Sequence, residues 1–333
     1  MIRQAQPLQG YIKDKNIFNR LTVRWRLAIS ATYPIAMNQK KILIAAFGLL
    51  AGAINIYAQG GFVLFGQASE KLAPAHKTVR PLTGPYFHED AFITTDLRAW
   101  YLEHDFDSDT NAVLNNGSVS VAALQVRIAL TESLQLVAYK DGHTDFDNAG
   151  ALNENNGFND IGAGLKWAFL QDWENQVHMA VGIGYEFGWG DDEVLQDTDE
   201  LRLWISWNKG FDKLHFGATG NLILAQDDSE GLLGNSDMIT LHLHADYYLC
   251  EWLSPVVELN GYFAQDSGGL GVSGVDAGSL AGGKENDTYT VAIGAELRPL
   301  GDDLGVRIAY ETELNDNASL FGDRWTLSAV YEF

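Results

Sequence analysis

Apolar and polar residues alternate at every second position through most of this chain after residue 90. Segment 236–251 shows the pattern most clearly. One of its faces carries Ile239, Leu241, Leu243, Ala245, Tyr247 and Leu249, and the other carries Thr240, His242, His244, Asp246 and Tyr248. Because successive side chains of a β-strand point to opposite faces, the pattern predicts an all-β protein whose strands each have one apolar and one polar face.

The alternating segments number about twelve and are joined by connections of two lengths. The predicted strands lie near residues 92–104, 118–130, 133–141, 158–170, 176–189, 199–209, 212–224, 237–250, 254–265, 287–298, 303–314 and 324–333. Short turns such as 131–133 alternate with long polar loops such as 266–287. This alternation is typical of a single antiparallel up-and-down transmembrane barrel in an outer membrane, with short periplasmic turns and long external loops. An even strand number places both ends of the barrel on the periplasmic side.

A soluble β-sandwich is the main alternative, because its strands also alternate. In a sandwich the apolar face forms the interior, whereas in a membrane barrel the apolar face meets lipid and the interior is polar. Nearly every predicted strand here carries polar residues on one face, many of them charged, and aliphatic or aromatic residues on the other. We therefore expect a single-domain membrane barrel over residues 92–333.

Composition excludes several other classes of protein. The formal net charge is −22, and phosphate binding needs a basic face, so a nucleic-acid partner is excluded. Cys250 is the only cysteine, which rules out an intramolecular disulfide and a thiolate metal cluster. The 34 glycines and 11% aromatic residues are typical of sheets with many turns and aromatic girdles.

The residues before the barrel fall into three parts. Residues 37–58 contain two lysines, an apolar run and then small residues, which is the form of a secretory signal peptide with a cleavage site after Ala58 or Ala68. A membrane anchor is the alternative, although the apolar run is short for a spanning helix. Residues 1–36 are then an upstream extension from a wrongly chosen start codon. Residues 59–91 show no clear period and are either a periplasmic linker or a plug in the lumen.

The last ten residues, RWTLSAVYEF, end in an aromatic residue on the apolar face of a strand. They resemble the carboxy-terminal assembly signal of Gram-negative outer-membrane proteins, carried here by Trp325, Leu327, Tyr331 and Phe333. The resemblance implies that the barrel-assembly machinery reads this strand and that the protein is exported to the bacterial outer membrane.

A second resemblance lies in GFNDIGAGLKWAFL at 157–170. It is similar to the Gly-x-x-Asp-x-x-x-Gly-x-Lys-Tyr strand of the barrel proteins grouped with the meta-pathway of phenol degradation, with Trp167 in place of the tyrosine. That group implies transport of hydrophobic or aromatic compounds.

The polar face of the strands predicts which side chains line the lumen. The basic ones are Arg98, Arg127, Lys166, Arg202, Lys213, Arg298 and Arg307; the acidic ones are Asp96, Asp160, Glu186, Glu200, Asp246, Glu258, Glu296, Glu311 and Glu313; the histidines are His178, His215, His242 and His244. Because an unpaired charge in a narrow lumen is costly, we expect pairs such as Glu296 with Arg298 or Arg307. The set either forms a selective constriction or only fills the barrel with salt bridges.

Two other kinds of chemistry compete with this interpretation. His242, His244, Asp246 and His215 share one face and could hold zinc or copper, but such histidines more commonly only form hydrogen bonds in a lumen, so we predict no metal and no cofactor. A serine hydrolase needs a serine beside an oriented histidine, and no His-x-Ser strand pair or Gly-x-Ser-x-Gly motif occurs. We therefore predict that the protein is not an enzyme.

The sequence as a whole predicts an outer-membrane channel or passive diffusion transporter for small molecules. Outward aromatic residues near the strand ends would form the girdles: Trp167, Tyr185, Trp189, Trp207, Tyr310 and Trp325. The acidic external loops would attract divalent cations at the lipopolysaccharide surface. The alternatives are a structural or adhesive barrel with a plugged lumen and, more remotely, a membrane-embedded hydrolase.

Overall fold

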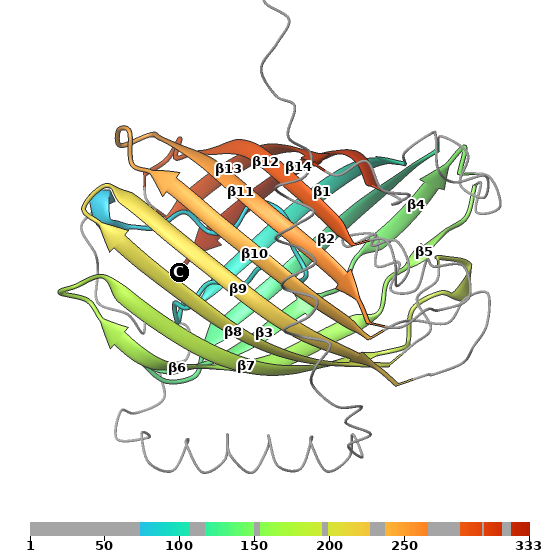
Figure 1. Ribbon diagram of the computed structural model, residues 1–333, viewed down its shortest axis with the longest axis horizontal. Coiled ribbons are helices and arrows are strands. Elements are labelled where there is room, and N and C mark those ends of the chain that lie inside the picture. The colour runs from blue at the N-terminus through green and yellow to red at the C-terminus, as the bar shows by residue number, and fades with distance from the viewer. Residues whose placement is uncertain are drawn as a thin grey trace, which may run out of the picture. The chain divides into compact units, whose positions relative to one another are not determined.

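The fold is described from a computed structural model (Figure 1). It covers residues 74–106, 117–149, 154–194, 199–226, 237–265, 287–301, 303–314 and 321–333. The predicted upstream extension, the signal peptide and residues 59–73 lie outside this set. Neither short helix of the described chain has the length and apolar content needed to cross a membrane.

Period-two segments of the sequence form antiparallel strands. They are β1 (Asp96–Phe106), β2 (Ser118–Ala129), β3 (Leu134–Lys140), β4 (His143–Asp147), β5 (Asn156–Phe158), β6 (Ile161–Asp172), β7 (Val177–Phe187), β8 (Glu200–Phe211), β9 (Leu214–Ala225), β10 (Met238–Tyr247), β11 (Leu253–Ala264), β12 (Thr288–Leu297), β13 (Leu304–Glu313) and β14 (Phe321–Glu332). Two 3-10 turns, η1 (Pro74–His76) and η3 (Asp192–Val194), complete the described elements.

The sheet closes on itself. Strand β1 pairs with β2 on one side and with β14 on the other, and Asp96 lies opposite Arg127 and Glu332. Strand β4 pairs with the first half of β2 and β3 with its second half. On the other side, β5 pairs with β4 and β6 pairs with β3. We therefore count β3 with β4, and β5 with β6, as one bent strand each. The result is the predicted closed antiparallel barrel of twelve strands (Figure 1). Closure gives β1 and β14, the first and last strands, a partner on both sides.

The two faces of the wall match the predicted alternation. On β10, Leu241 and Leu243 are 50% and 52% exposed on the outside, whereas His242 and His244 are buried inside. The same holds around the barrel, where the exposed large side chains are mostly leucine, isoleucine, phenylalanine and tryptophan. A soluble sandwich would bury this apolar face, so the sandwich alternative is wrong.

One bend interrupts the wall between β2 and the β3–β4 strand. Residues 123–125 of β2 have no backbone partner on that side, because Gly142 turns the chain with a φ of +124°. Side chains replace the missing ladder bonds: the Asp141 carboxylate accepts from the Leu124 amide at 3.1 Å, and the Gln125 amide donates to the Tyr139 carbonyl. A lipid-facing wall needs such replacements, since an unsatisfied backbone group in hydrocarbon is costly.

Several predicted boundaries differ from the structure by a few residues. The third predicted strand, 133–141, extends through β4 to Asp147, because the sequence does not reveal that the chain resumes its path after the bend. The first strand begins at Asp96 instead of residue 92. The two residues before it bond to neighbouring strands through other groups: the Thr95 hydroxyl accepts from the Ala129 amide of β2, and the Thr94 carbonyl accepts from the Gln135 side chain of β3. The last strand begins at Phe321, three residues earlier than predicted.

Candidate functional site

Residues 77–95, which we call the inner segment, run through the interior of the barrel before β1 (Figure 1). Every residue from 79 to 91 is buried, although the segment forms neither helix nor strand. Its backbone polar groups therefore depend on partners from the barrel wall. The wall supplies these partners from two sets of residues, one of carboxylates that accept hydrogen bonds and one of side chains that donate them.

Carboxylates of β10 and β11 accept hydrogen bonds from the first half of the inner segment. The amide of Val79 donates to Asp246 at 3.2 Å. Glu258 accepts from the amides of Leu82 at 2.8 Å and Thr83 at 2.7 Å, one on each carboxylate oxygen. A carboxylate that accepts two amide hydrogens is a strong, oriented anchor. These contacts tie a chain segment without regular structure to the wall.

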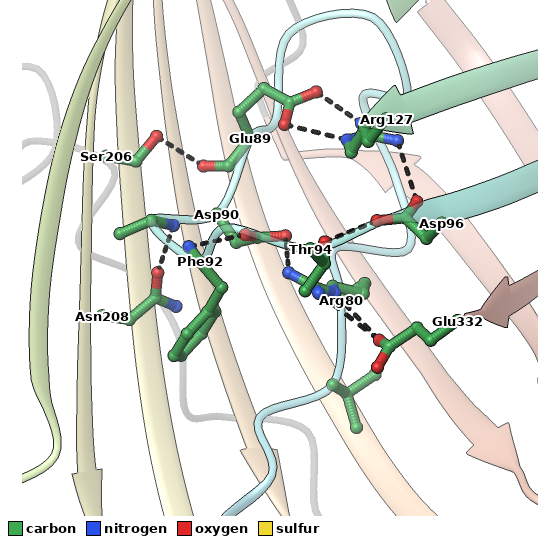
Figure 2. A network of polar contacts seen from close by, with 12 residues as sticks. Arg80, Glu89, Asp90, Phe92, Thr94, Asp96, Arg127, Ser206, Asn208 and Glu332 are labelled. Atoms are coloured by element: carbon green, nitrogen blue, oxygen red, sulfur yellow. Dashed lines mark hydrogen bonds and ion pairs between the residues drawn. The ribbon is translucent and has the colours of Figure 1, made fainter. Parts of the chain in front are cut away.

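Glu332, at the end of β14, holds the basic side chains of the same half. It lies 2.9 Å from the Lys77 ammonium and 3.3 Å from the Arg80 guanidinium. Arg80 also pairs with Asp90 of the inner segment at 2.6 Å (Figure 2). The acidic wall thus faces the amides and cations of the inner segment.

Polar side chains of β8 and β9 donate to carbonyl groups of the second half. Arg202 donates to the carbonyls of Tyr86 and Phe87 while its guanidinium lies over aromatic rings, 4.7 Å from the centre of Trp204. Further donors reach the same stretch of backbone: Asn221 to Phe87, and Ser206 and Thr219 to Glu89. This wall therefore faces the carbonyl oxygens of the inner segment.

The Glu89 carboxylate points to Arg127 of β2 (Figure 2), and Lys166 of β6 lies near the carboxylates of both Glu89 and Asp90. Arg127 donates two hydrogen bonds to Glu89, at 2.5 and 3.3 Å, and the Lys166 ammonium lies 3.4 Å from Asp90 and 3.8 Å from Glu89. Burial alone would raise the pKa of Glu89, but Arg127 and Lys166 outweigh it and hold this pKa at about 2. The same opposition, with Arg80 as the nearest cation, holds the pKa of Asp90 well below its usual range.

The predicted histidine cluster forms a chain of hydrogen bonds with carboxylates. Asp246 lies 2.8 Å from His215 and 3.0 Å from His244, and His244 reaches Glu258 at 2.8 Å. His242 lies apart from this chain and bonds to Asn260 at 2.8 Å. No group of three or more histidine, cysteine or acidic side chains that could hold a metal ion occurs among the residues described above.

Other predicted lumen charges form ion pairs between wall strands. Glu296 contacts Arg298 at 2.8 Å and Arg307 at 2.7 Å, as the sequence pattern suggested. Glu311 lies 3.4 Å from Arg324. These pairs join residues of the barrel wall and therefore stabilise the wall itself.

The predicted lumen-lining residues are all buried in the structure: Asp96, Arg98, Arg127, Lys166, Glu186, Arg202, His215, His242, His244, Asp246, Glu258, Glu296, Arg298, Arg307 and Glu311. Glu313, at the end of β13, is partly buried. Lys213 is exposed in the turn after β8. Its predicted place in the lumen was wrong, because side chains no longer alternate between two faces where a strand ends.

Sequence reasoning missed several residues of this site. Arg80, Glu89 and Asp90 lie in a stretch without period, and nothing local indicates that they enter the barrel. Lys140 pairs with Glu186, but it lies beside the bend at Gly142, where the alternation is interrupted. Its charge in an otherwise apolar strand was the signal that could have found it.

The other end of the interior, where the long loops begin, carries an apolar cluster. Trp100, Leu102 and Phe106 of β1 face inward there together with Val119 and Val121 of β2. The opposite wall and the inner segment complete the cluster with Tyr86, Phe87, Phe146, Ala149, Val194, Ile223, Met238 and Tyr262. Buried charged side chains lie at the same end of the barrel, among them Arg202, Glu311 and Arg324.

Solved structures give the clearest comparison for this arrangement. The COG4313 outer membrane channel from Pseudomonas putida F1 is similar over 77% of this chain and 100% of its own, with a TM-score of 0.55 and 14% sequence identity. The chain has the fold of an outer-membrane β-barrel.

A second solved structure is similar to this chain to a lesser degree. The KdgM porin aligns over 72% of this chain and 99% of its own, with a TM-score of 0.42 and 10% identity. No protein-family model matches the sequence, and no curated protein matches it. The likeness to an outer-membrane β-barrel is therefore one of fold.

Proposed function

We propose that this protein is an outer-membrane channel, a passive diffusion transporter for small molecules, and that the inner segment closes it. The observation that carries the proposal is the filling of a polar barrel interior by a segment that belongs to no strand. Wall side chains hold this segment, together with a backbone hydrogen bond from Phe333 to Thr95. A cavity of about 10 Å³ beside Lys77, Glu296 and Arg307 is too small for a solute larger than water. Withdrawal of residues 77–95 would break no covalent bond and no strand pairing.

The outer surface supports a location in the bacterial outer membrane. Large apolar side chains cover it, including Ile205, Leu243, Val257 and Ile293, each more than 45% exposed. Water would make such a continuous apolar surface unfavourable, whereas lipid solvates it. Outer-membrane lipid and lipopolysaccharide are therefore the proposed surroundings.

The last strand supports the barrel-assembly machinery as a partner. Trp325, Leu327, Tyr331 and Phe333 are all about half exposed on the outer face of the barrel. A factor that reads the final strand from the lipid side would meet these four side chains. Their exposure is what the resemblance of the C-terminus to an assembly signal requires.

Hydrophobic or aromatic compounds are the finer proposal for the solute. The apolar cluster around Trp100, Leu102 and Phe106 offers such a compound a surface to pack on. The resemblance of residues 157–170 to the phenol-degradation group points to the same class.

A non-transporting structural barrel is the second candidate. The ion pairs between the inner segment and the wall favour it, because Arg80, Glu89, Arg127 and Asp90 are buried, and breaking a buried pair is costly. The two candidates differ in whether the inner segment ever leaves the lumen.

Single-channel conductance in a planar bilayer tests the proposal. We expect refolded residues 59–333 to conduct rarely and a variant without 59–91 to conduct steadily. Glu258→Gln removes one of the two oxygens that accept from Leu82 and Thr83, so it should open the channel more often. Glu296→Gln is the matched control, since the ion pairs of Glu296 go to the wall. Silence of every variant would rule out a channel and favour the structural barrel.

A further inference from the structure

Three cations of the wall lie in the interior on β1, β2 and β6, near Asp96. Arg98, Arg127 and Lys166 are at most 3% exposed. The wall itself supplies one nearby carboxylate, Asp96, which lies 3.5 Å from Arg127. The other carboxylates that contact Arg127 and Lys166 belong to the inner segment.

Arg98 is the unsatisfied member of this group. Its Nε is buried and has no hydrogen-bond partner among the residues that the structure describes. Its charge is opposed by those of Arg127 and Arg307 and is favoured by the carboxylates of Asp96 and of Glu89, which belongs to the inner segment. A buried guanidinium nitrogen without a partner is costly, and an anion beside it would remove that cost.

Withdrawal of the inner segment leaves this part of the wall positive. Glu89 and Asp90 leave with it, so Lys166 loses both of its carboxylate partners and Arg127 keeps only Asp96. The three cations and one carboxylate then carry a net charge of 3 − 1 = +2. An opened lumen would attract an anion to this point.

We propose that Arg98, Arg127 and Lys166 form a binding site for aromatic carboxylates, and that Glu89 and Asp90 occupy it while the channel is closed. The inference rests on the proposed function and names the solute class. Arg127 already donates two hydrogen bonds to one carboxylate, which is the planar geometry that guanidinium and carboxylate share.

Aromatic residues next to the cations would contact the part of the solute that carries no charge. Trp100 is two residues from Arg98 on the same inward face of β1 and begins the apolar cluster. Tyr86 of the inner segment packs edge-on against Trp100, with ring centres 5.2 Å apart. Withdrawal of the inner segment removes Tyr86 from Trp100 and leaves this aromatic surface free for the ring of a solute.

Equilibrium binding of benzoate to the refolded full chain tests this site. Glu89→Gln removes the charge that competes for Arg127, so it should bind benzoate more tightly than the wild type. Lys166→Gln in that background should weaken binding by about tenfold, as expected for one charge-assisted hydrogen bond. Lys209→Gln is the control, because Lys209 donates to the Asn175 carbonyl in the turn between β6 and β7, away from the three cations. Benzyl alcohol, which lacks the carboxylate, should not compete.

Equal affinity in the wild type and Glu89→Gln would overturn the site. Equal losses of affinity on substitution of Lys166 and of Lys209 would also overturn it. Conductance separates this outcome from failure of the channel. A variant without residues 59–91 that conducts but binds no benzoate keeps the channel and refutes the site. Benzoate binding by a barrel that never conducts keeps the site and refutes the channel.

Discussion

Individual carboxylates decide how firmly the inner segment is held. Glu258 and Asp246 of the wall accept from its amides, and Glu89 of the segment accepts from Arg127. Each contact joins residues more than 35 positions apart in sequence. Charge-assisted hydrogen bonds of this kind are stronger than neutral ones, and leaving one partner buried alone costs more than the bond contributes.

Acidification tests the contribution of Glu89. The pKa of this carboxyl in the folded protein, about 2, lies below its ordinary value of 4.5. Its ion pair is therefore fully present above about pH 4.5 and is lost as the pH falls toward 2. We expect Glu89→Gln to open more often than the wild type at pH 7, and this difference to vanish as the pH approaches 2. A difference in opening that stays constant over this range would contradict the assignment.

The bent strand β3–β4 is the element that departs most from regular geometry. Gly142 makes the bend, and a Cβ at this position would lie 2.7 Å from the Ala122 carbonyl and 2.9 Å from the Ala123 Cβ. The clash is with backbone and a short side chain, which cannot move aside. The bend therefore requires glycine for both its φ and its space.

Alanine at Gly142 should destabilise the barrel. We expect strain of about 1–3 kcal/mol from the positive φ, with a further loss from the clash, measured by urea unfolding of the refolded protein. Gly301→Ala is the control, because Gly301 has a φ of +92° and nothing within 4 Å of an added Cβ. Equal losses at the two positions would mean that the wall relaxes around residue 142.

On the scale of the whole molecule, the protein is defined by where its apolar and charged side chains lie. The exterior is apolar and the interior carries most of the buried charge. This order is the reverse of a soluble domain and suits a lipid solvent.

Arginine on the outer face tests that order. Leu243, in the middle of β10, is 52% exposed, and Leu300, in the turn between β12 and β13, is 79% exposed. We expect Leu243→Arg to cost about 2–4 kcal/mol of folding free energy in lipid vesicles and Leu300→Arg about 0–1 kcal/mol. Fractions of folded protein in vesicles of increasing thickness would show the difference. If both variants fold equally well, the outer surface does not face hydrocarbon.

Local sequence determined the wall, and tertiary structure decided what fills it. The period-two pattern of segments such as 236–251 fixes the inside and outside of each strand, because side-chain direction alternates with every residue. The bend at Gly142 and the path of residues 77–95 have no such local signal. The inner segment takes its position from partners such as Glu258 and Arg202, which lie more than 100 residues away along the chain. Only the closed barrel brings those partners to it.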